Sequence, residues 1–355
     1  MPFDFLGLTY PSIKNVVAQM SNVDAVRVSL QGPQADQLLK TGGKDNVSFF
    51  KLSEQEISRL SDFDKLELFL CEAERSNSLG NQDVRLSCHV SEQFFLFRIE
   101  RGGEDYVTVG VENLGIIDEL RDDGVRKNMK FGNELVPTVT LDEVERPVRL
   151  ILFWEDRTAG LCSLISFFHS KFNRGLRRMQ FCNASEGQKH SEDIRRIVEY
   201  VNSNNVQIAG VECVQQICEE DYKFLLENLT PTFIFCADAK MNPEFKFDGQ
   251  IHCERIRISS GHWFTLDTLL KNANRKVVIV QDVDYTKEEL VTFLEHWKDG
   301  KFPELEQLEL ETKAVPADVV KDFEKLEDQG MVLKGPDNKR LEVRAERKMF
   351  TCYIY

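Results

Sequence analysis

The chain has 355 residues, with 45 Lys and Arg against 59 Asp and Glu, and a formal net charge of −14. Because nucleic acids and anionic membranes are bound mainly through lysine and arginine, this balance argues against a general binder of either. With 42% hydrophobic residues the chain can bury a sizeable core, and its length predicts two or more structural units.

Three features of the sequence predict the cellular location of the protein. No stretch approaches the ~18 consecutive apolar residues that span a bilayer, so we expect no membrane segment. The N-terminus places Asp4 where a signal peptide needs basic residues, and it lacks a long apolar run. The nine cysteines are scattered, and no pair has the two-residue spacing of a metal or redox loop. We therefore expect reduced thiols and a cytoplasmic and/or nuclear location.

The first 40 residues predict three short helices. Apolar side chains recur at helical spacing in residues 12–20, 22–30 and 34–40, with Asn22 as the expected cap of the second helix. Three such helices bury little apolar surface alone, so we expect residues 1–40 to dock on a partner. Residues 41–82 are expected to be a linker or helical segment.

The apolar period changes to two between residues 83 and 148. Residues 84–90, 94–99 and 106–111 alternate as half-buried strands do, and Arg101 to Asp105 has the composition of a hairpin loop. We expect a small antiparallel β region over residues 83–148.

Residues 149–355 alternate strand and helix patterns. Candidate strands begin near residues 148, 176, 206, 232, 253, 276 and 305. Helical patterns cover residues 161–172, 191–202, 221–228, 265–271 and 286–297. The last of these helices opens with Thr286-Lys-Glu-Glu289, which matches a capping box. A hairpin around residues 335–338 and a strand at 349–355 close the chain.

A strand and helix repeating every ~20–30 residues predict a leucine-rich-repeat-like βα solenoid with the C-terminal hairpin as its cap. Leu176-x-x-Met179-x-Phe181 and Leu305-x-x-Leu308-x-Leu310 have the core spacing of such repeats. A doubly wound nucleotide-binding sheet alternates in the same way, but it needs a glycine-rich turn after a strand, which the sequence lacks. The predicted fold class is therefore α/β.

The motifs of the common enzyme classes are absent from the sequence. Gly42-Gly43-Lys44 is followed by Asp45 where a phosphate loop needs Ser or Thr. There is no G-x-S-x-G elbow and no H-E-x-x-H. Asp282 and Asp284 follow a strand, but a solvated turn accounts for them better than a metal site does. We predict no catalytic residue, no metal and no cofactor.

The N-terminal segment resembles an F-box, the helical unit that docks on the Skp-type adaptor of cullin-RING ubiquitin ligases. The resemblance rests on Leu6-x-Leu8-x-x-Pro11, the apolar positions up to Met20, and Asp24-Ala-Val-Arg-Val-Ser-Leu30. Thr9-Tyr10 departs from the leucine usual before the proline. The downstream region resembles the nematode F-box-associated domain, above all at Glu289-Leu-Val-Thr-Phe-Leu-Glu-His-Trp297-Lys-Asp-Gly300 and the following Phe302 to Leu310.

The resemblance implies the substrate-recognition subunit of an SCF-type E3 ligase. Such a subunit is not an enzyme: it brings a target protein to the ligase for ubiquitination and degradation. The implied adaptor-binding residues are Leu6, Leu8, Pro11, Ile13, Val16, Val17, Met20, Val23, Val26 and Leu30. Period two places further residues outward on the repeat strands, and these are the predicted target-binding residues: Arg178, Gln180, Arg255, Arg257, Gln307 and Glu309.

Two other functions remain open on the sequence alone. The chain is either such a receptor or a binding protein that sequesters its target without recruiting a ligase. Because the nematode family is expanded, foreign or toxic proteins are candidate targets in both cases, and the second case would then be an antidote. An α/β enzyme is the other alternative, although no motif supplies a nucleophile, a base or a phosphate cradle.

Overall fold

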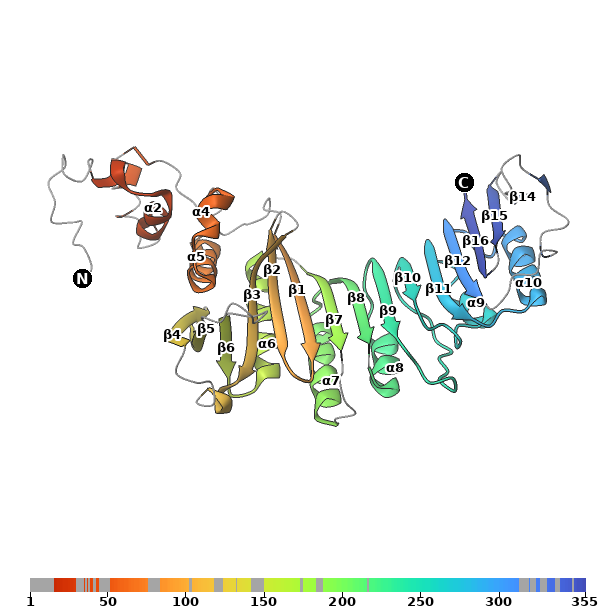
Figure 1. Ribbon diagram of the computed structural model, residues 1–355, viewed down its shortest axis with the longest axis horizontal. Helices are drawn as coiled ribbons and strands as arrows, with labels where there is room; N and C mark the ends of the chain where they lie inside the picture. Colours follow the sequence, from red (N-terminus) through yellow and green to blue (C-terminus); the bar gives the residue numbers. More distant parts are fainter. Residues whose placement is uncertain are drawn as a thin grey trace. The chain divides into compact units, whose positions relative to one another are not determined.

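The protein is mixed α and β, with a large sheet and several helices (Figure 1). The computed structural model describes residues 16–29, 35, 37, 39–40, 43–44, 52–75, 84–101, 104–117, 124–131, 133–141, 150–172, 175–182, 188–215, 217–312, 319, 324–325, 331–335, 339–346 and 348–355. It forms two compact units. Unit 1 comprises Met1–Arg85 with Leu96–Arg174, and unit 2 comprises Leu86–Phe95 with Gly175–Tyr355. The expected boundary at residue 149 thus lies within unit 1.

The N-terminal part of unit 1 is helical. Residues 16–19 are helical and precede α2 (Asn22–Ser29), and α4 (Glu54–Ser58) and α5 (Asp62–Arg75) follow. Much of the first and third expected helices lies outside the described residues. The expected cap of α2 is wrong by one residue. The amide of Asp24 donates to Ser21 Oγ at 3.1 Å, so Ser21 is the cap and the Asn22 side chain is left for another contact.

The strands of unit 1 form a mixed arrangement. They are β2 (Phe95–Arg101), β3 (Glu104–Asn113), β4 (Gly124–Phe131), β5 (Glu134–Leu141) and β6 (Leu150–Trp154), in the order β2-β3-β6-β5-β4. β4, β5 and β6 pair antiparallel, but β6 returns beside β3 in the same direction. The parallel partner β6 lies beyond residues 83–148, the range expected to be antiparallel. Alternation in the sequence located β2 and β3 but not β4 and β5, and it did not show that β6 would join β3.

The core of unit 1 is built from phenylalanines of three elements. α6 (Arg157–Phe172) packs on β3 and β6, and α5 contacts both β3 and α6. The Phe168 ring of α6 lies 4.9 Å from Phe97 of β2 and 5.9 Å from Phe69 of α5, centroid to centroid. Helix α5 belongs to the segment expected to be a linker or helical segment, and its buried apolar side chains make it part of the core.

Unit 2 contains a run of parallel strands linked mostly by helices. In spatial order they are β1 (Val84–Ser91), β7 (Leu176–Cys182), β8 (Ile208–Gln215), β9 (Ile234–Ala239), β10 (Arg255–Ile258), β11 (Val277–Val283) and β12 (Gln307–Thr312). The linking helices are α7 (Gln188–Ser203), α8 (Glu219–Asn228), α9 (Leu266–Lys271) and α10 (Lys287–Lys298). From β7 to β12 the spatial order follows the chain order. The strands therefore lack the reversal at which doubly wound sheets bind nucleotides.

Antiparallel strands follow this run at its C-terminal end. β16 (Met349–Ile354) pairs with β12, and β15 (Arg340–Glu346), β14 (Met331–Lys334) and β13 (Glu324–Lys325) follow in order. They cover the edge of β12, which would otherwise expose a row of unpaired backbone groups.

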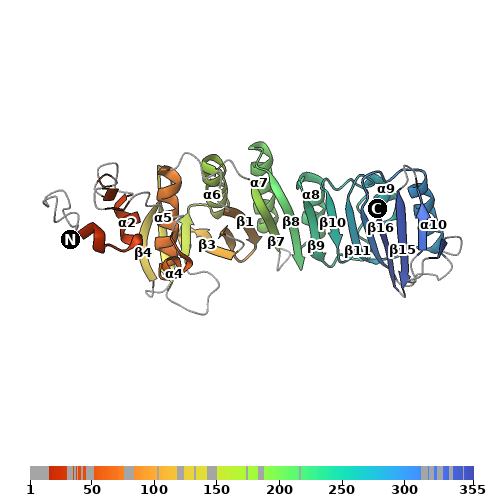
Figure 2. The same cartoon turned by 90° about the horizontal axis from the view of Figure 1, so that it is seen from above.

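Side chains alternate across the sheet of unit 2, and the helices cover one face. One buried row, read by register from β7 to β16, contains Met179, Val211, Phe235, Ile256, Val278, Leu308 and Cys352. Tyr222 of α8 contacts Phe235, and Phe293 of α10 contacts Phe350 on β16. Figure 2 shows α7 and α8 along one side of the strands. Residues at the alternate positions consequently point to the face that the helices leave open.

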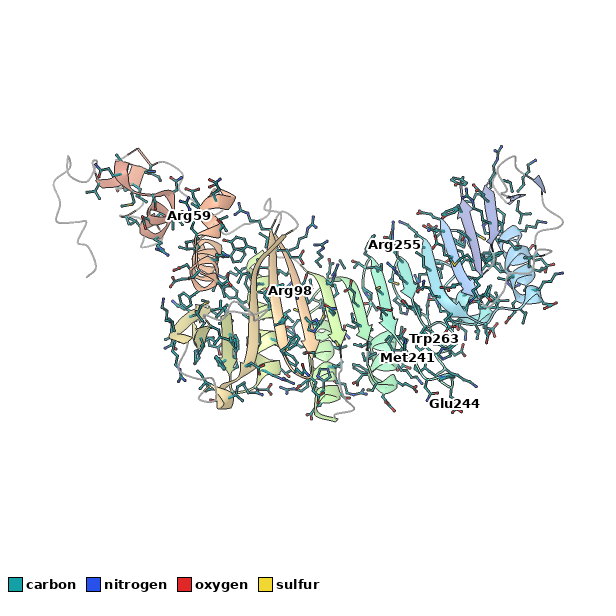
Figure 3. The ribbon with its side chains drawn as sticks, in the orientation of Figure 1. Arg59, Arg98, Met241, Glu244, Arg255 and Trp263 are labelled. Atoms are coloured by element: carbon teal, nitrogen blue, oxygen red, sulfur yellow. The ribbon has the colours of Figure 1, made fainter. Side chains whose placement is uncertain are left out.

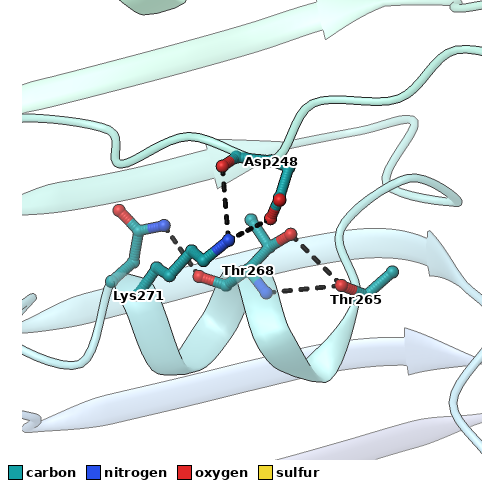
Figure 4. A network of polar contacts seen from close by, with 5 residues as sticks. Asp248, Thr265, Thr268 and Lys271 are labelled. Atoms are coloured by element: carbon teal, nitrogen blue, oxygen red, sulfur yellow. Dashed lines mark hydrogen bonds and ion pairs between the residues drawn. The ribbon is translucent and has the colours of Figure 1, made fainter.

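A loop replaces a helix between β9 and β10. Its Phe245 and Phe247 pack against Trp263, with ring centroids 5.6 and 5.8 Å apart. Polar contacts tie the same loop to α9: Lys271 Nζ donates to both the carboxylate and the backbone carbonyl of Asp248 (Figure 4). The buried Asn272 side chain accepts from the amide of Ile251 at 2.8 Å. These contacts fix the loop between β9 and β10 against α9 and Trp263.

Helix α10 has well-defined ends. Thr286 Oγ1 accepts from the amide of Glu289 at 3.2 Å, and the Glu289 carboxylate accepts from the amide of Thr286 at 2.8 Å, so the predicted capping box is confirmed. At the other end Gly300 has a φ of +74°, and Lys301 N donates to His296 O at 3.0 Å. This is the glycine-terminated cap common at helix C-termini.

Removing this N-cap gives the first prediction. Thr286→Ala leaves the amide of Glu289 without its side-chain acceptor, so the free energy of unfolding should fall by about 1 kcal/mol. Urea unfolding of the two proteins measures the difference. Thr286→Ser keeps the acceptor oxygen and should retain most of the stability, whereas equal losses in both variants would contradict a capping role.

Candidate functional site

The open face of the unit 2 sheet carries two rows of outward side chains, which together we call the outward face. The first row, in strand order, is Arg178, Gly210, Ile234, Arg255, Val277, Gln307 and Tyr353. The second row is Gln180, Glu212, Cys236, Arg257, Ile279, Glu309 and Thr351. Each neighbouring pair within a row is a register partner on adjacent strands.

All six residues predicted to bind a target lie on the outward face. Three belong to the first row and three to the second, because each strand contributes residues two positions apart. Arg178 and Arg257 are exposed, whereas the other four are half-buried. The structure thus brings the six onto one surface, and their contact with a target stays a prediction.

The two ends of the outward face are internally paired. On β7, Arg178 Nε lies 3.2 Å from Glu212 Oε1, and Gln180 Oε1 lies 3.0 Å from His89 Nδ1 on β1. On β12, Gln307 Nε2 donates to Glu309 Oε1 at 2.7 Å. Tyr353 OH on β16 reaches the same oxygen at 3.4 Å. Burial and the nearby Glu309 carboxylate raise the pKa of Tyr353, so its hydroxyl keeps its proton at neutral pH.

The middle of the outward face is different. Arg255 and Arg257 of β10 form no ion pair with any carboxylate in the described part of the chain. The Arg255 guanidinium lies over the Phe233 ring, 4.8 Å from its centroid. Their register partners on β9 and β11 are Ile234, Cys236, Val277 and Ile279. The direct neighbours of the two cationic groups on the adjacent strands are thus three apolar side chains and a thiol, and Figure 3 marks the position of Arg255.

Several thiols of unit 2 are held in the protonated form. Burial raises the pKa of Cys236 on the outward face, and the Glu212 carboxylate raises it further. Burial raises the pKa of Cys253 to about 11 and, with a hydrogen bond to Asp221, that of Cys218 to about 11. The eight cysteines whose side chains the structure describes form no disulfide. A protonated thiol attacks slowly, so Cys236, Cys253 and Cys218 do not resemble activated catalytic cysteines.

The buried acids predict a loss of stability at alkaline pH. Burial raises the pKa of Cys352 and of Tyr222 well above their ordinary values. The unfolded chain therefore releases these protons at a lower pH than the folded chain does, and the free energy of unfolding should fall as the pH rises above about 9. Urea midpoints at pH 7 and pH 10 measure this fall. Cys352→Ala should show a smaller fall, and an equal or larger fall in that variant would contradict the assignment.

The predicted adaptor-binding residues separate into buried and accessible groups. Leu6, Leu8, Pro11, Ile13 and Leu30 lie outside the described residues. Val26 is fully buried, and Val17, 1% exposed, forms a small core with Ala25 and Leu39. Val16, Met20 and Val23 are half-buried. The last three are the accessible members of the set, and Val17 and Val26 instead hold the helices together.

Met20 and Val23 open onto a cavity that the sequence did not predict. The cavity measures about 500 Å³, and α4 and the residues after it supply Glu56, Arg59 and Leu60 to its lining. Asn22 Nδ2 donates to Glu56 Oε1 at 2.8 Å, and Arg27 pairs with Asp64 of α5 at 2.8 Å. Ser53-x-x-Glu56 is a capping box in the structure, and this motif is the signal from which α4 was predictable.

The described part of the chain contains neither a metal-ligand cluster nor a membrane-spanning helix. No group of three or more His, Cys, Asp or Glu side chains there could hold a metal ion. Asp282 and Asp284 are exposed, and Asp282 has a φ of +54° where the register of β11 shifts between Val280 and Val283. No helix among the described residues is long and apolar enough to cross a membrane.

Comparison with known proteins gives one match. Residues 245–310 match the F-box associated family. The matched segment includes β10, α9, β11 and α10 and continues to Leu310 of β12, so it carries Arg255, Arg257, Gln307 and Glu309 of the outward face. Neither the curated proteins nor the solved structures gave a match to the chain.

Proposed function

We propose that the chain is the substrate-recognition subunit of an SCF-type cullin-RING E3 ubiquitin ligase. The match of residues 245–310 to the F-box associated family carries this proposal, because the matched strands also present the outward face. The N-terminal helices, as an F-box, would bind the Skp-type adaptor. Unit 2, as a leucine-rich-repeat-like solenoid, would hold the target protein. The parallel strands in chain order support this proposed architecture.

The proposed subunit performs no chemistry of its own. It raises the local concentration of target lysines near the ubiquitin-carrying enzyme, which is catalysis by proximity. The proposal requires two separate surfaces. One is the accessible apolar set of Val16, Met20 and Val23, and the other is the outward face. A partner at each surface would then be held on the same chain.

Co-purification of the adaptor tests the first surface. Val23→Asp places a charge at the half-buried Val23, next to the cavity, without entering the core formed by Val17, Ala25 and Leu39. We expect the full-length chain to co-purify with the adaptor and the cullin. The amount of each recovered with the Val23→Asp variant should be at least about ten-fold lower. Val125→Asp is the matched control, since Val125 is 52% exposed on β4.

Two results would contradict the proposal. Adaptor and cullin absent from the wild-type preparation would exclude ligase recruitment, and equal recovery with Val23→Asp would exclude this docking surface. Blocking the cullin should also raise the abundance of the bound target. A target that stays bound but unaffected by the cullin would instead identify a sequestering protein.

A further inference from the structure

The centre of the outward face offers two guanidinium groups to an external anion. Arg255 and Arg257 lie two positions apart on β10. Glu254, the carboxylate next to Arg255 in the chain, pairs with Lys276. Asp238, the next outward residue of β9 after Cys236, forms no ion pair within 4.0 Å among the described residues. The chain carries 59 acidic residues, yet none of those described forms an ion pair within 4.0 Å with either arginine.

The other acids of the two rows are also occupied. Glu212 pairs with Arg178, and Glu309 accepts from Gln307. In the second row each lies two strands from Arg257, which is roughly 10 Å at the usual strand separation. Glu212 and Glu309 are therefore distant from a group bound at Arg257, and the exposed Asp238 is the carboxylate on the adjacent strand, two positions after Cys236, the register partner of Arg257.

The surroundings favour a ligand that combines acidic and apolar groups. Ile234, Val277 and Ile279 flank the arginines, and Phe233, 43% exposed, lies beneath the Arg255 guanidinium. An exposed ion pair in water contributes ~0–1 kcal/mol. A partner that covers the apolar flanks removes water from the pair, which strengthens the attraction and adds apolar burial. A guanidinium also fits a carboxylate with two parallel hydrogen bonds.

The spacing of the arginines indicates the form of the ligand. Side chains two positions apart on a strand are separated by ~6.6 Å, and an extended peptide presents its own alternate side chains at the same interval. We propose that Arg255 and Arg257 bind an extended acidic segment of the target protein, with Asp or Glu at alternate positions and apolar side chains beside them. This inference rests on the proposed function, because it assigns the recognised segment to the target.

Fluorescence anisotropy with purified full-length protein tests the inference without any ligase component. The probe is a labelled, capped peptide, Leu-Thr-Glu-Thr-Glu-Thr-Leu, which places both glutamates on one face. A second probe replaces both glutamates with glutamine, and a third has them adjacent and so on opposite faces. We expect the first probe to bind at least about ten-fold more tightly than the other two, since one charged hydrogen-bonded contact is worth about that factor.

Charge reversal provides the matched test. Arg255→Glu with Arg257→Glu should lower the affinity for the acidic probe at least about ten-fold. The same double variant should bind a probe that has lysines in place of the glutamates. Lys298→Glu with Lys301→Glu changes the net charge equally at two exposed residues at and beyond the end of α10, and should leave the acidic probe unaffected. Thermal unfolding of both double variants confirms that they remain folded.

Three results would overturn the inference. Equal affinity for the glutamate and glutamine probes would exclude carboxylate recognition. Unchanged binding of the acidic probe by the folded arginine variant would exclude these two residues. Tighter binding of a probe with a single phosphoserine would assign the arginines to a phosphopeptide instead. Because the adaptor is absent from this assay, each failure is distinguishable from a failure of adaptor binding, which co-purification measures.

Discussion

Phe293→Ala is expected to lower the free energy of unfolding by about 3–5 kcal/mol. The Phe293 ring is fully buried on α10, and its centroid lies 5.0 Å from that of Phe302 and 6.2 Å from that of Phe350. Its truncation removes buried apolar surface and leaves a cavity between α10, the segment before β12 that contains Phe302, and β16. Urea unfolding followed by circular dichroism measures the change.

An exposed apolar residue provides the control for this prediction. Leu135 is 65% exposed on β5, so Leu135→Ala should change the free energy of unfolding by no more than about 0.5 kcal/mol. If the two substitutions had equal effects, Phe293 would not be the packing centre of α10.

Gly261→Ala is expected to destabilise unit 2 by about 1–3 kcal/mol. A Cβ at Gly261 would lie 2.1 Å from Val280 Cγ1 and 2.8 Å from the carbonyl oxygen of Gln281. The amide of Gly261 donates to that same oxygen at 2.8 Å, so the backbone cannot move away without losing a hydrogen bond. The added methyl group therefore forces the segment that follows β10 away from β11, and thermal unfolding should show a lower midpoint.

Another glycine allows the same substitution without a clash. A Cβ at Gly115 would have no neighbouring atom within 4 Å among the described residues, so Gly115→Ala should leave the midpoint nearly unchanged. A normal midpoint for Gly261→Ala, or equal shifts for both alanine variants, would show that the approach of β10 to β11 is not tightly constrained.

Local patterns in the sequence predicted much of unit 2. Alternation within single strands placed Arg178, Arg255 and Gln307 on the correct face, because the direction of a strand side chain depends only on its neighbours. The capping box at Thr286 was predictable for the same reason, since both of its hydrogen bonds lie within one helical turn. Features of this kind need no knowledge of the distant parts of the chain.

Pairings between distant segments were not predictable from the sequence. Strand β6 joins β3 in parallel, and β1 joins β7 in parallel, although the period-two pattern of residues 83–148 is equally compatible with hairpins. The cap of α2 shifted to Ser21 because Ser and Asn are both good caps and stand side by side. Partner choice depends on tertiary packing, which periodicity does not encode.

In the candidate site, too, some features follow from local sequence patterns and others depend on tertiary packing. The outward residues were found by period two, whereas the isolation of Arg255 and Arg257 from acids depends on which strands lie beside β10. Helical spacing likewise marked Val17 and Met20 in one expected helix and Val23 in the next, and the F-box resemblance joined them into one set. It did not separate the buried Val17 from the accessible Val23, because that difference arises from packing against Ala25 and Leu39.

The central claim is that one chain joins a Skp-type adaptor to a target protein. Calorimetric titration of purified adaptor into the purified full-length chain tests it most directly. We predict saturable binding with one adaptor per chain and a negative heat-capacity change, because the contact buries apolar side chains. The absence of binding by a chain that unfolds cooperatively, and is therefore folded, would contradict the claim.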